Sequence, residues 1–537
     1  MEYMRSETPV KNESPSTSVG FRLAEALWYI SALLIIIAAG IAKLEFPLGR
    51  DQGLFLLYAM GIDRGASLYI ELWDFKSPGV FWFYLMAGRL FGFNERGVHL
   101  LELVWLLALS GLMMLTLREY FRHRWLSAVA PAAVVGVYYV FARFDQATQV
   151  EILASLPIFA CIWLLSRAYD NDRPRVIGFY FAGVVASVAT VFKLVYAPLI
   201  IVFVLFALYG CYRQRAGALR PIARLLVSFT AGVLTVWIPV FAYFWLTGSF
   251  PSFIETNFVI PFLYLAGGDP APIGRLLMGL VRLLAATAAW LIFVALALPT
   301  LWRAGEPPLS RFLWTWLIGG VVVILIQRVS WHAYHWMFVL TPMGILACRG
   351  VDITIERLRA GVAARPLAAM GLSLILVLPA VGGLFDPLGD RIYQFFSMRA
   401  DGKTGIEEYR RKMDKRYGRV VDSAAFVQQD NRPGPIYVFG SSLYHILLDR
   451  PQTLPYSGNE FEYLLPSQIN ELAAGLAVQR PTYIFLEKDK FDVVPRKGPE
   501  IMTMLSRDYA VSWQGADGRW YTRIDKEAGD QPAAASP

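Results

Sequence analysis

Long apolar runs separated by short polar loops dominate the chain up to residue 385. Each run approaches the roughly 20 apolar residues that a helix needs to cross a bilayer core, so the pattern predicts a polytopic α-helical membrane protein with about 11 transmembrane helices. Lys193 divides one long run, because 176–211 would be too long as a single span. The predicted spans are 26–42, 98–117, 126–142, 150–168, 176–192, 194–211, 222–246, 276–301, 312–327, 334–348 and 367–385.

Alternate loops between these spans differ in their content of Lys and Arg. Loops rich in these residues stay on the cytoplasmic side of a membrane. We therefore expect a cytoplasmic N-terminus in the plasma (inner) membrane, and an odd number of spans places the C-terminus outside. The basic set comprises the N-terminal segment, 118–124, 167–175, 212–224, 303–311 and 349–365.

The composition changes after residue 385, where charged residues become frequent and apolar runs shorten. Residues 436–440 and 482–488 have the pattern of buried strands, and 469–479 that of an amphipathic helix between them. Strand, helix and strand in this order favour a small α/β fold. We thus expect a transmembrane domain over 1–385 and an extracytoplasmic α/β domain over 386–537.

The overall composition supports this division. Of the 537 residues, 56% are hydrophobic and 17% charged, whereas soluble domains have roughly 45–50% and about 25%. An ordinary cytosolic enzyme is excluded. The net charge of +8 is explained by the basic loops, and without a recognition motif nucleic acid is not an expected partner. Three scattered cysteines form neither a disulfide framework nor a metal site.

The outer segment 43–97 is too long for a mere connection. Its stretches 52–61 and 79–91 resemble short amphipathic helices lying at the membrane interface. Asp51, beside the first of them, is either a helix N-cap or a catalytic group. Lys76, with Asp74 close by, either anchors the loop at the interface or binds a phosphate at headgroup depth.

Two acidic residues, Asp145 and Glu151, flank the mouth of another outer loop. Charge near a span is costly, so it has a structural or functional reason. Capping or an exposed turn is one reason. The other is an acidic cluster with Asp51 that deprotonates a hydroxyl or binds a divalent cation, for which Asp51 and Asp74 are candidate ligands.

Basic and aromatic side chains gather at the outer end of a late span. Arg328, His332, Tyr334 and His335 suit contact with a phosphate, although an aromatic belt or a histidine metal pair would use the same residue types. Lys193 interrupts an apolar run; it either extends to the interface or belongs to a site.

No Walker loop, Gly-x-Gly-x-x-Gly helix start or Gly-x-Ser-x-Gly elbow occurs in the chain. The sequence thus gives no indication of ATP, nicotinamide or acyl-serine chemistry. The candidate polar groups converge on the outer face instead. A lipid-linked substrate would be accessible there.

The order of these features resembles the GT-C superfamily of membrane glycosyltransferases, and within it the bacterial branch related to protein O-mannosyltransferases and the lipid A aminoarabinose transferase. The most specific stretch is 50–79, RDQGLFLLYAMGIDRGASLYIELWDFKSPG, and the resemblance extends over the whole membrane region. It departs from the lipid A branch at Phe75, where that branch has a glutamate, and at Ser77, where a proline is common. A metal site and an acceptor therefore do not carry over.

The resemblance implies inverting transfer of a sugar from a polyprenyl-phosphate donor to a lipid, glycan or protein acceptor. Asp51 matches the first-loop aspartate, a catalytic base or acceptor-orienting group, and Lys76 matches a donor-phosphate ligand. Either Asp145 or Glu151 matches the acidic position of the second outer loop. The remaining donor-phosphate candidates are Arg328, His332, Tyr334, His335 and Lys193. A secondary transporter, a lipid-linked glycan polymerase or ligase, and a membrane scaffold are the alternatives.

Overall fold

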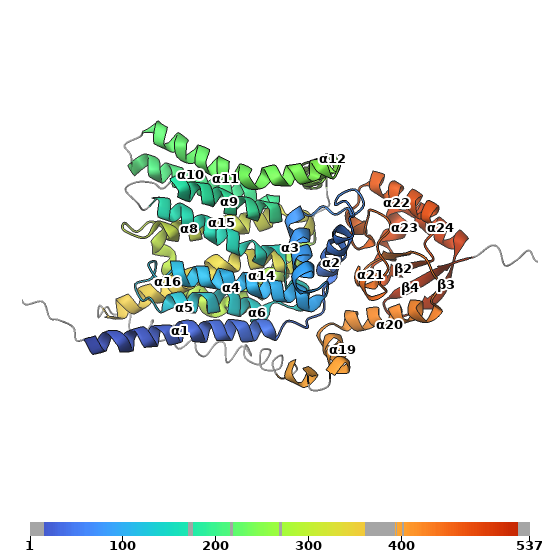
Figure 1. Cartoon of the computed structure of the whole chain (residues 1–537), viewed down its shortest axis with the longest axis horizontal. Helices are drawn as coiled ribbons and strands as arrows, with labels where there is room; N and C mark the ends of the chain where they lie inside the picture. Colours follow the sequence, from blue (N-terminus) through green and yellow to red (C-terminus); the bar gives the residue numbers. More distant parts are fainter. Residues whose placement is uncertain are drawn as a thin grey trace, which may run out of the picture.

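The computed structural model describes residues 15–169, 176–214, 218–267, 271–359, 393, 395–399 and 402–524. A bundle of apolar helices forms one part of the molecule, and a smaller sheet with helices forms the other (Figure 1). The helices of the bundle are α1 (Pro15–Ile41), α4 (Glu95–Thr116), α5 (Leu126–Pro131), α6 (Val137–Phe141), α7 (Val150–Leu153), α8 (Ser155–Tyr169), α9 (Val176–Phe192), α10 (Ala197–Gln214), α11 (Leu219–Leu246), α14 (Ile273–Ala297), α15 (Pro308–Ile326) and α16 (Leu340–Arg359).

Within the described residues, six helices are long and apolar enough to cross a membrane, and a seventh span results if the bent pair 273–288 and 290–301 is one crossing. Three shorter apolar helices cover 25–41, 126–140 and 176–192. Ten of the predicted spans coincide with these apolar helices. The eleventh, 367–385, lies outside the described residues, as does the predicted boundary at 385.

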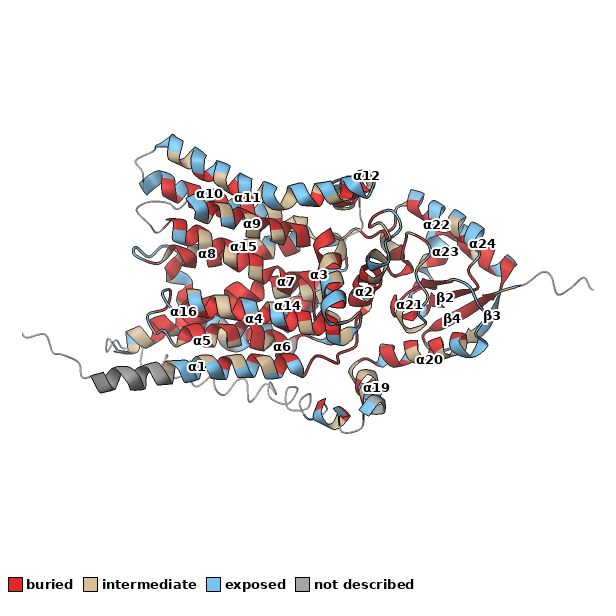
Figure 2. Ribbon diagram, in the orientation of Figure 1, coloured by how far each residue is buried: buried red, intermediate tan, exposed pale blue. Residues whose placement is uncertain are grey.

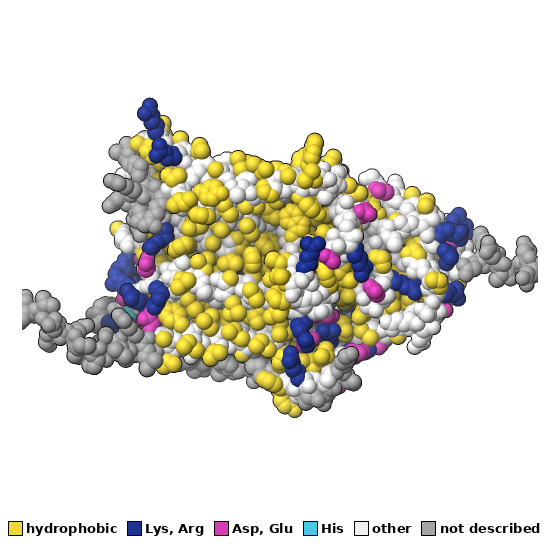
Figure 3. Space-filling view, in the orientation of Figure 1, with side chains coloured by type: hydrophobic (Ala, Val, Ile, Leu, Met, Phe, Trp, Pro, Cys, Tyr) yellow, Lys and Arg dark blue, Asp and Glu magenta, His cyan; other side chains and the backbone are white. Residues whose placement is uncertain are grey.

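The outer surface of the bundle is apolar. In Figure 2 the central helices are buried, whereas α1 and α11 turn exposed residues outward. Large hydrophobic side chains such as Leu34, Val227 and Trp245 are among the exposed ones. Figure 3 shows a broad hydrophobic face with basic side chains grouped near its two ends. An exposed apolar surface of this extent is that of a polytopic membrane protein.

The basic loops meet at one end of the bundle. The Asp352 carboxylate accepts backbone hydrogen bonds from Arg122 (3.0 Å) and His123 (3.1 Å). Arg349 pairs with Glu306 at 2.8 Å. Loops that the Lys and Arg pattern assigns to a common side therefore do lie together.

The segment between α1 and α4 lies at the opposite end. It forms α2 (Arg50–Asp63) and α3 (Pro78–Phe91), so the two predicted short helices are confirmed in position. Residues 52–59 of α2 are all buried, however, so the prediction that this helix is amphipathic was wrong. Both are largely buried between the bundle and the C-terminal region (Figure 2). Pro78 starts α3, where a missing N–H costs nothing because the first amides of a helix have no partner.

The C-terminal region contains a four-stranded sheet in the order β1-β2-β4-β3. Strand β1 pairs with β2 in parallel, while β4 is antiparallel to both β2 and β3. The predicted strand, helix and strand are confirmed; the hairpin of β3 and β4 was not predicted. The elements are α19 (Gly402–Met413), α20 (Lys415–Asp430), β1 (Ile436–Phe439), α21 (Leu443–Leu447), α22 (Pro466–Gln479), β2 (Tyr483–Glu487), α23 (Val493–Lys497), α24 (Pro499–Asp508), β3 (Tyr509–Gln514) and β4 (Gly518–Arg523).

The carboxyl end of this parallel strand pair faces the start of α2. Glu487, the last residue of β2, accepts a hydrogen bond from Arg50 at 2.7 Å, and Asp489 lies 2.5 Å from the same guanidinium. The backbone N–H of Trp73 donates to the carbonyl of Pro455 at 2.9 Å. These contacts fix the C-terminal region against the segment that carries Asp51 and Lys76.

Candidate active site

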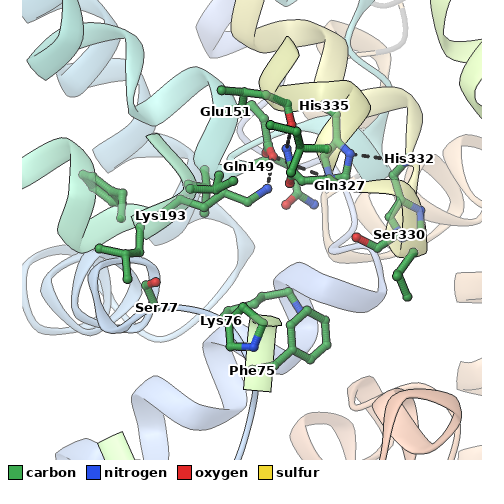
Figure 4. Close-up of a pocket in the computed structure, with 18 of the residues that line it drawn as sticks. Phe75, Lys76, Ser77, Gln149, Glu151, Lys193, Gln327, Ser330, His332 and His335 are labelled. Carbon is green, nitrogen blue, oxygen red and sulfur yellow. Dashed lines mark hydrogen bonds and ion pairs between the residues drawn. The ribbon is translucent and has the colours of Figure 1, made fainter. Parts of the chain in front are cut away.

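A cavity of about 1120 Å³ lies at this junction. It is lined by the first outer segment, by the α6–α8 and α9–α10 connections, by the segment before α16 and by the C-terminal region. Figure 4 shows several of its polar side chains facing one another. The predicted site residues that line it are Asp51, Lys76, Glu151, Lys193, His332, Tyr334 and His335.

Asp51 is the second residue of α2, and its carboxylate Oδ2 accepts a hydrogen bond from the Tyr334 hydroxyl at 3.0 Å. The N-cap is Gly49, so the alternative role of Asp51 as the cap is not observed. Burial would raise the pKa of Asp51. The charge of Lys76, with the Tyr334 hydrogen bond, outweighs burial and holds that pKa below its ordinary value. Asp51 is therefore ionised and can accept a proton.

Lys76 is held between two carboxylates. Its Nζ lies 3.4 Å from Asp74 and 3.3 Å from Glu460, and the Asp74 side chain is fully buried. Burial opposes the charge on Lys76, but Asp74, Glu460 and Asp51 raise its pKa above the ordinary value. The ammonium also lies 4.5 Å from the centre of the Phe75 ring, and an aromatic face further stabilises a cation.

Glu151 forms the second polar group of the cavity. Its Oε1 accepts a hydrogen bond from Lys193 at 2.7 Å and lies 3.7 Å from Nε2 of His335 (Figure 4). Lys193 can reach it because its backbone is extended, between the end of α9 and the 3₁₀ turn that precedes α10. The predicted break of the apolar run at Lys193 is thus confirmed.

His332 and Tyr334 stack with ring centres 5.1 Å apart. Burial lowers the pKa of His332, in spite of the opposing charge of Asp51. A neutral imidazole accepts or donates a hydrogen bond without competing for the negative charge on Asp51.

The structure does not bring two of the predicted residues to the cavity. Asp145 pairs with Arg143 at 3.3 Å, and its backbone packs against Gly49. Arg328 does not line the cavity either; its carbonyl accepts a hydrogen bond from the Ala271 N–H at 2.8 Å. Of the two acidic candidates in the second outer loop, Glu151 is therefore the one that faces the site.

The residues do not fit a divalent cation. Lys76 lies against the Asp74 carboxylate, where it supplies the positive charge that a metal would supply. No group of three or more His, Cys, Asp or Glu side chains that could hold an ion occurs among the described residues.

Several lining residues were not predicted from the sequence. Asn459, Glu460, Glu462 and Tyr463 belong to the 3₁₀ helix η8 (Gly458–Tyr463) of the C-terminal region. The only sequence signal that could have identified them is a pair of acidic residues that alternate with aromatic residues in a short loop. Nothing local connects that loop to Lys76, which it approaches only in the folded chain.

The fold and the cavity together define a polytopic helical membrane protein with a polar site at one end of its bundle. A sequence model of a family described as dolichyl-phosphate-mannose-protein mannosyltransferase matches residues 75–245. No sequence in a set of curated proteins matches the chain significantly.

Two solved structures share the fold. A crystal structure of ArnT from Cupriavidus metallidurans bound to undecaprenyl phosphate has a TM-score of 0.59 and 15% identity, over 94% of this chain and 99% of that one. The apo state of the same ArnT has a TM-score of 0.54 and 14% identity, over 95% and 98%. The predicted resemblance to the GT-C membrane glycosyltransferases is confirmed by this fold and by the family match.

Proposed function

We propose that the protein is an inverting glycosyltransferase that moves a sugar from a polyprenyl-phosphate donor to a lipid, glycan or protein acceptor. The observation that carries the proposal is the arrangement of Asp51, Lys76 and Lys193 around a single cavity. The family match over residues 75–245 and the ArnT fold support the reaction class. The basic loops at the other end of the bundle favour an outer, periplasmic position for the cavity.

The cavity also suits a prenyl chain. Beside its polar part it is lined by Val202, Phe262, Ile318 and Val322, and these four side chains are also exposed on the apolar surface of the bundle, from 48% for Val202 to 70% for Phe262. A lipid tail can therefore leave the cavity sideways into the membrane while its phosphate remains at Lys76.

In the proposed reaction the acceptor hydroxyl attacks the anomeric carbon on the face opposite the phosphate. Asp51 takes the hydroxyl proton, a contribution on the order of 10²–10⁴-fold. The sugar–oxygen bond to the phosphate breaks as the new glycosidic bond forms. Lys76 and Lys193 offset the charge that gathers on the departing phosphate, and no covalent enzyme intermediate is required.

The test is to incubate purified protein with a panel of prenyl-phosphate sugars and measure free prenyl phosphate, with and without chelator. We expect acceptor-dependent release with at least one sugar and no effect of the chelator. Transport of a substrate without release, or release that is unchanged in the Asp51→Asn variant, would contradict the proposal.

A further inference from the structure

Glu460 is the one carboxylate that the C-terminal region brings into direct contact with Lys76, within the part of the chain that the structure describes. The two side chains are separated by 384 positions and lie 3.3 Å apart. The Glu460 side chain is 5% exposed. It is therefore part of the site and not of the outer surface.

The position of Glu460 is fixed from several sides. A Cβ atom on Gly458 would lie 2.2 Å from the carbonyl oxygen of Val438, so only glycine allows η8 to pack this closely on β1. The Asn459 amide donates to Glu460 Oε1 at 2.9 Å, and Lys490 donates to the Asn459 carbonyl at 3.2 Å. The fold thus directs this carboxylate at the lysine.

This contact leaves no unmatched positive charge on Lys76 for a donor phosphate. In the donor-free protein the Lys76 ammonium is already matched by Asp74 and Glu460, with Asp51 close by. A phosphodiester that binds Lys76 brings another negative charge into a largely buried site. Mutual repulsion then favours the loss of one carboxylate charge.

Glu460 is the group best placed to lose its charge. Burial raises the pKa of Asp74 as well, but Asp74 also accepts a hydrogen bond from the Lys76 backbone N–H at 2.9 Å, which stabilises its ionised form and which Glu460 lacks. Burial, together with the charges of Asp74, Asp51 and Glu462, raises the pKa of Glu460 to about 7 in spite of Lys76. Its proton can come directly from water near neutral pH.

We propose that Glu460 is a positioning residue that holds Lys76 while the donor is absent and takes up one proton when the donor phosphate binds. The carboxylate and a solvent proton give a neutral carboxyl group, and the Lys76 ammonium keeps its proton and pairs with the phosphate. No bond to the substrate forms or breaks in this step. The inference rests on the proposed function, because it presumes a phosphodiester at Lys76.

The test measures binding of farnesyl methyl phosphate, a phosphodiester whose single charge is constant between pH 6 and 9. For the native protein we expect a dissociation constant that is level below about pH 7 and rises by up to tenfold per pH unit above it, since one proton is taken up. The Glu460→Gln variant should bind at pH 8.5 as tightly as the native protein does at pH 6. Glu500→Gln, at an exposed position of α24, is the matched control and should behave as native.

A dissociation constant that rises with pH as steeply in Glu460→Gln as in the native protein would overturn the inference and leave the donor site intact. Weaker binding by that variant at every pH would do the same. Failure of the native protein to bind the probe at any pH would overturn the donor site, and with it the inference.

A second measurement does not depend on the variant. Addition of the probe to native protein at pH 7.5 in weak buffer should take up a substantial fraction of one proton per molecule bound, seen with an indicator dye. Binding without uptake would overturn the inference. His332 and Asp51 are not expected to take up this proton, because the pKa values of both are lowered.

Discussion

The Tyr334 hydroxyl donates a hydrogen bond to Asp51 Oδ2 at 3.0 Å across 283 positions of the chain. It joins the first turn of α2 to the segment that precedes α16, and both residues line the cavity. Tyr334 thereby fixes the orientation of the Asp51 carboxylate, which we propose as the base. The bond can be removed without loss of ring packing, because phenylalanine keeps the stacked ring.

We expect Tyr334→Phe to shift the acid limb of the pH–rate profile. The hydrogen bond stabilises the ionised form of Asp51, so its loss raises the pKa of Asp51 toward the ordinary value. The base is then protonated at a higher pH, and the acid limb of kcat/KM moves upward in pH. A hydrogen bond to a charged group contributes about 1.5–3 kcal/mol to the stability of the charged form. An unchanged limb would show that Asp51 is not the titrating base.

Asp51→Asn is expected to lower kcat by on the order of 10²–10⁴-fold, because the amide cannot take a proton. The variant should remain folded, since the amide oxygen still accepts the hydrogen bond from Tyr334. Turnover of a prenyl-phosphate sugar, with the elution profile of the purified protein, checks both points. Asp63→Asn, an exchange in the last turn of α2, is the control and should retain turnover.

Lys76→Met is expected to abolish donor binding and also to destabilise the protein by about 3–5 kcal/mol, because Asp74 is left buried and unpaired. The double variant Lys76→Met/Asp74→Asn removes that unpaired charge. It should recover much of the melting temperature but none of the binding of farnesyl methyl phosphate. Recovery of binding together with stability would show that Lys76 is structural and not a phosphate ligand.

Glu151→Gln and Asp145→Asn should have different effects. Glu151 faces the cavity and pairs with Lys193, so loss of its charge removes the ion pair that positions Lys193 and should reduce kcat/KM by at least tenfold. Asp145 pairs with Arg143 near the surface, and exposed pairs contribute about 0–1 kcal/mol. Asp145→Asn should therefore retain turnover. Loss of turnover in Asp145→Asn but not in Glu151→Gln would show that Asp145, and not Glu151, is the acidic residue of the second outer loop that acts in the reaction.

Much of the membrane region was predictable because its determinants are local. Runs of apolar residues predict helices wherever they occur, and Lys and Arg in the loops indicate which loops share a side. The extended backbone at Lys193 and the proline at the start of α3 follow from the same local rules. The predicted candidates Asp145 and Glu151 stood out because charge beside a span is costly, and Asp51 and Lys76 because of their place in the outer segment 43–97.

The assembly of the site was not predictable in the same way. Which of Asp145 and Glu151 faces the cavity depends on how the connection between α6 and α8 packs. The hairpin of β3 and β4 is likewise defined by its pairing with β2 and not by a long apolar run.

The sequence by itself therefore determined the medium in which the chain folds, the helices that cross it and the residue types of the site. The tertiary structure decided which charges meet. Glu460 and Lys76 are 384 positions apart, and neither carries a local pattern that names the other. Hydrophobic periodicity acts over a few residues, whereas an ion pair in a buried site depends on the packing of whole elements, so their contact could be recognised only in the folded protein.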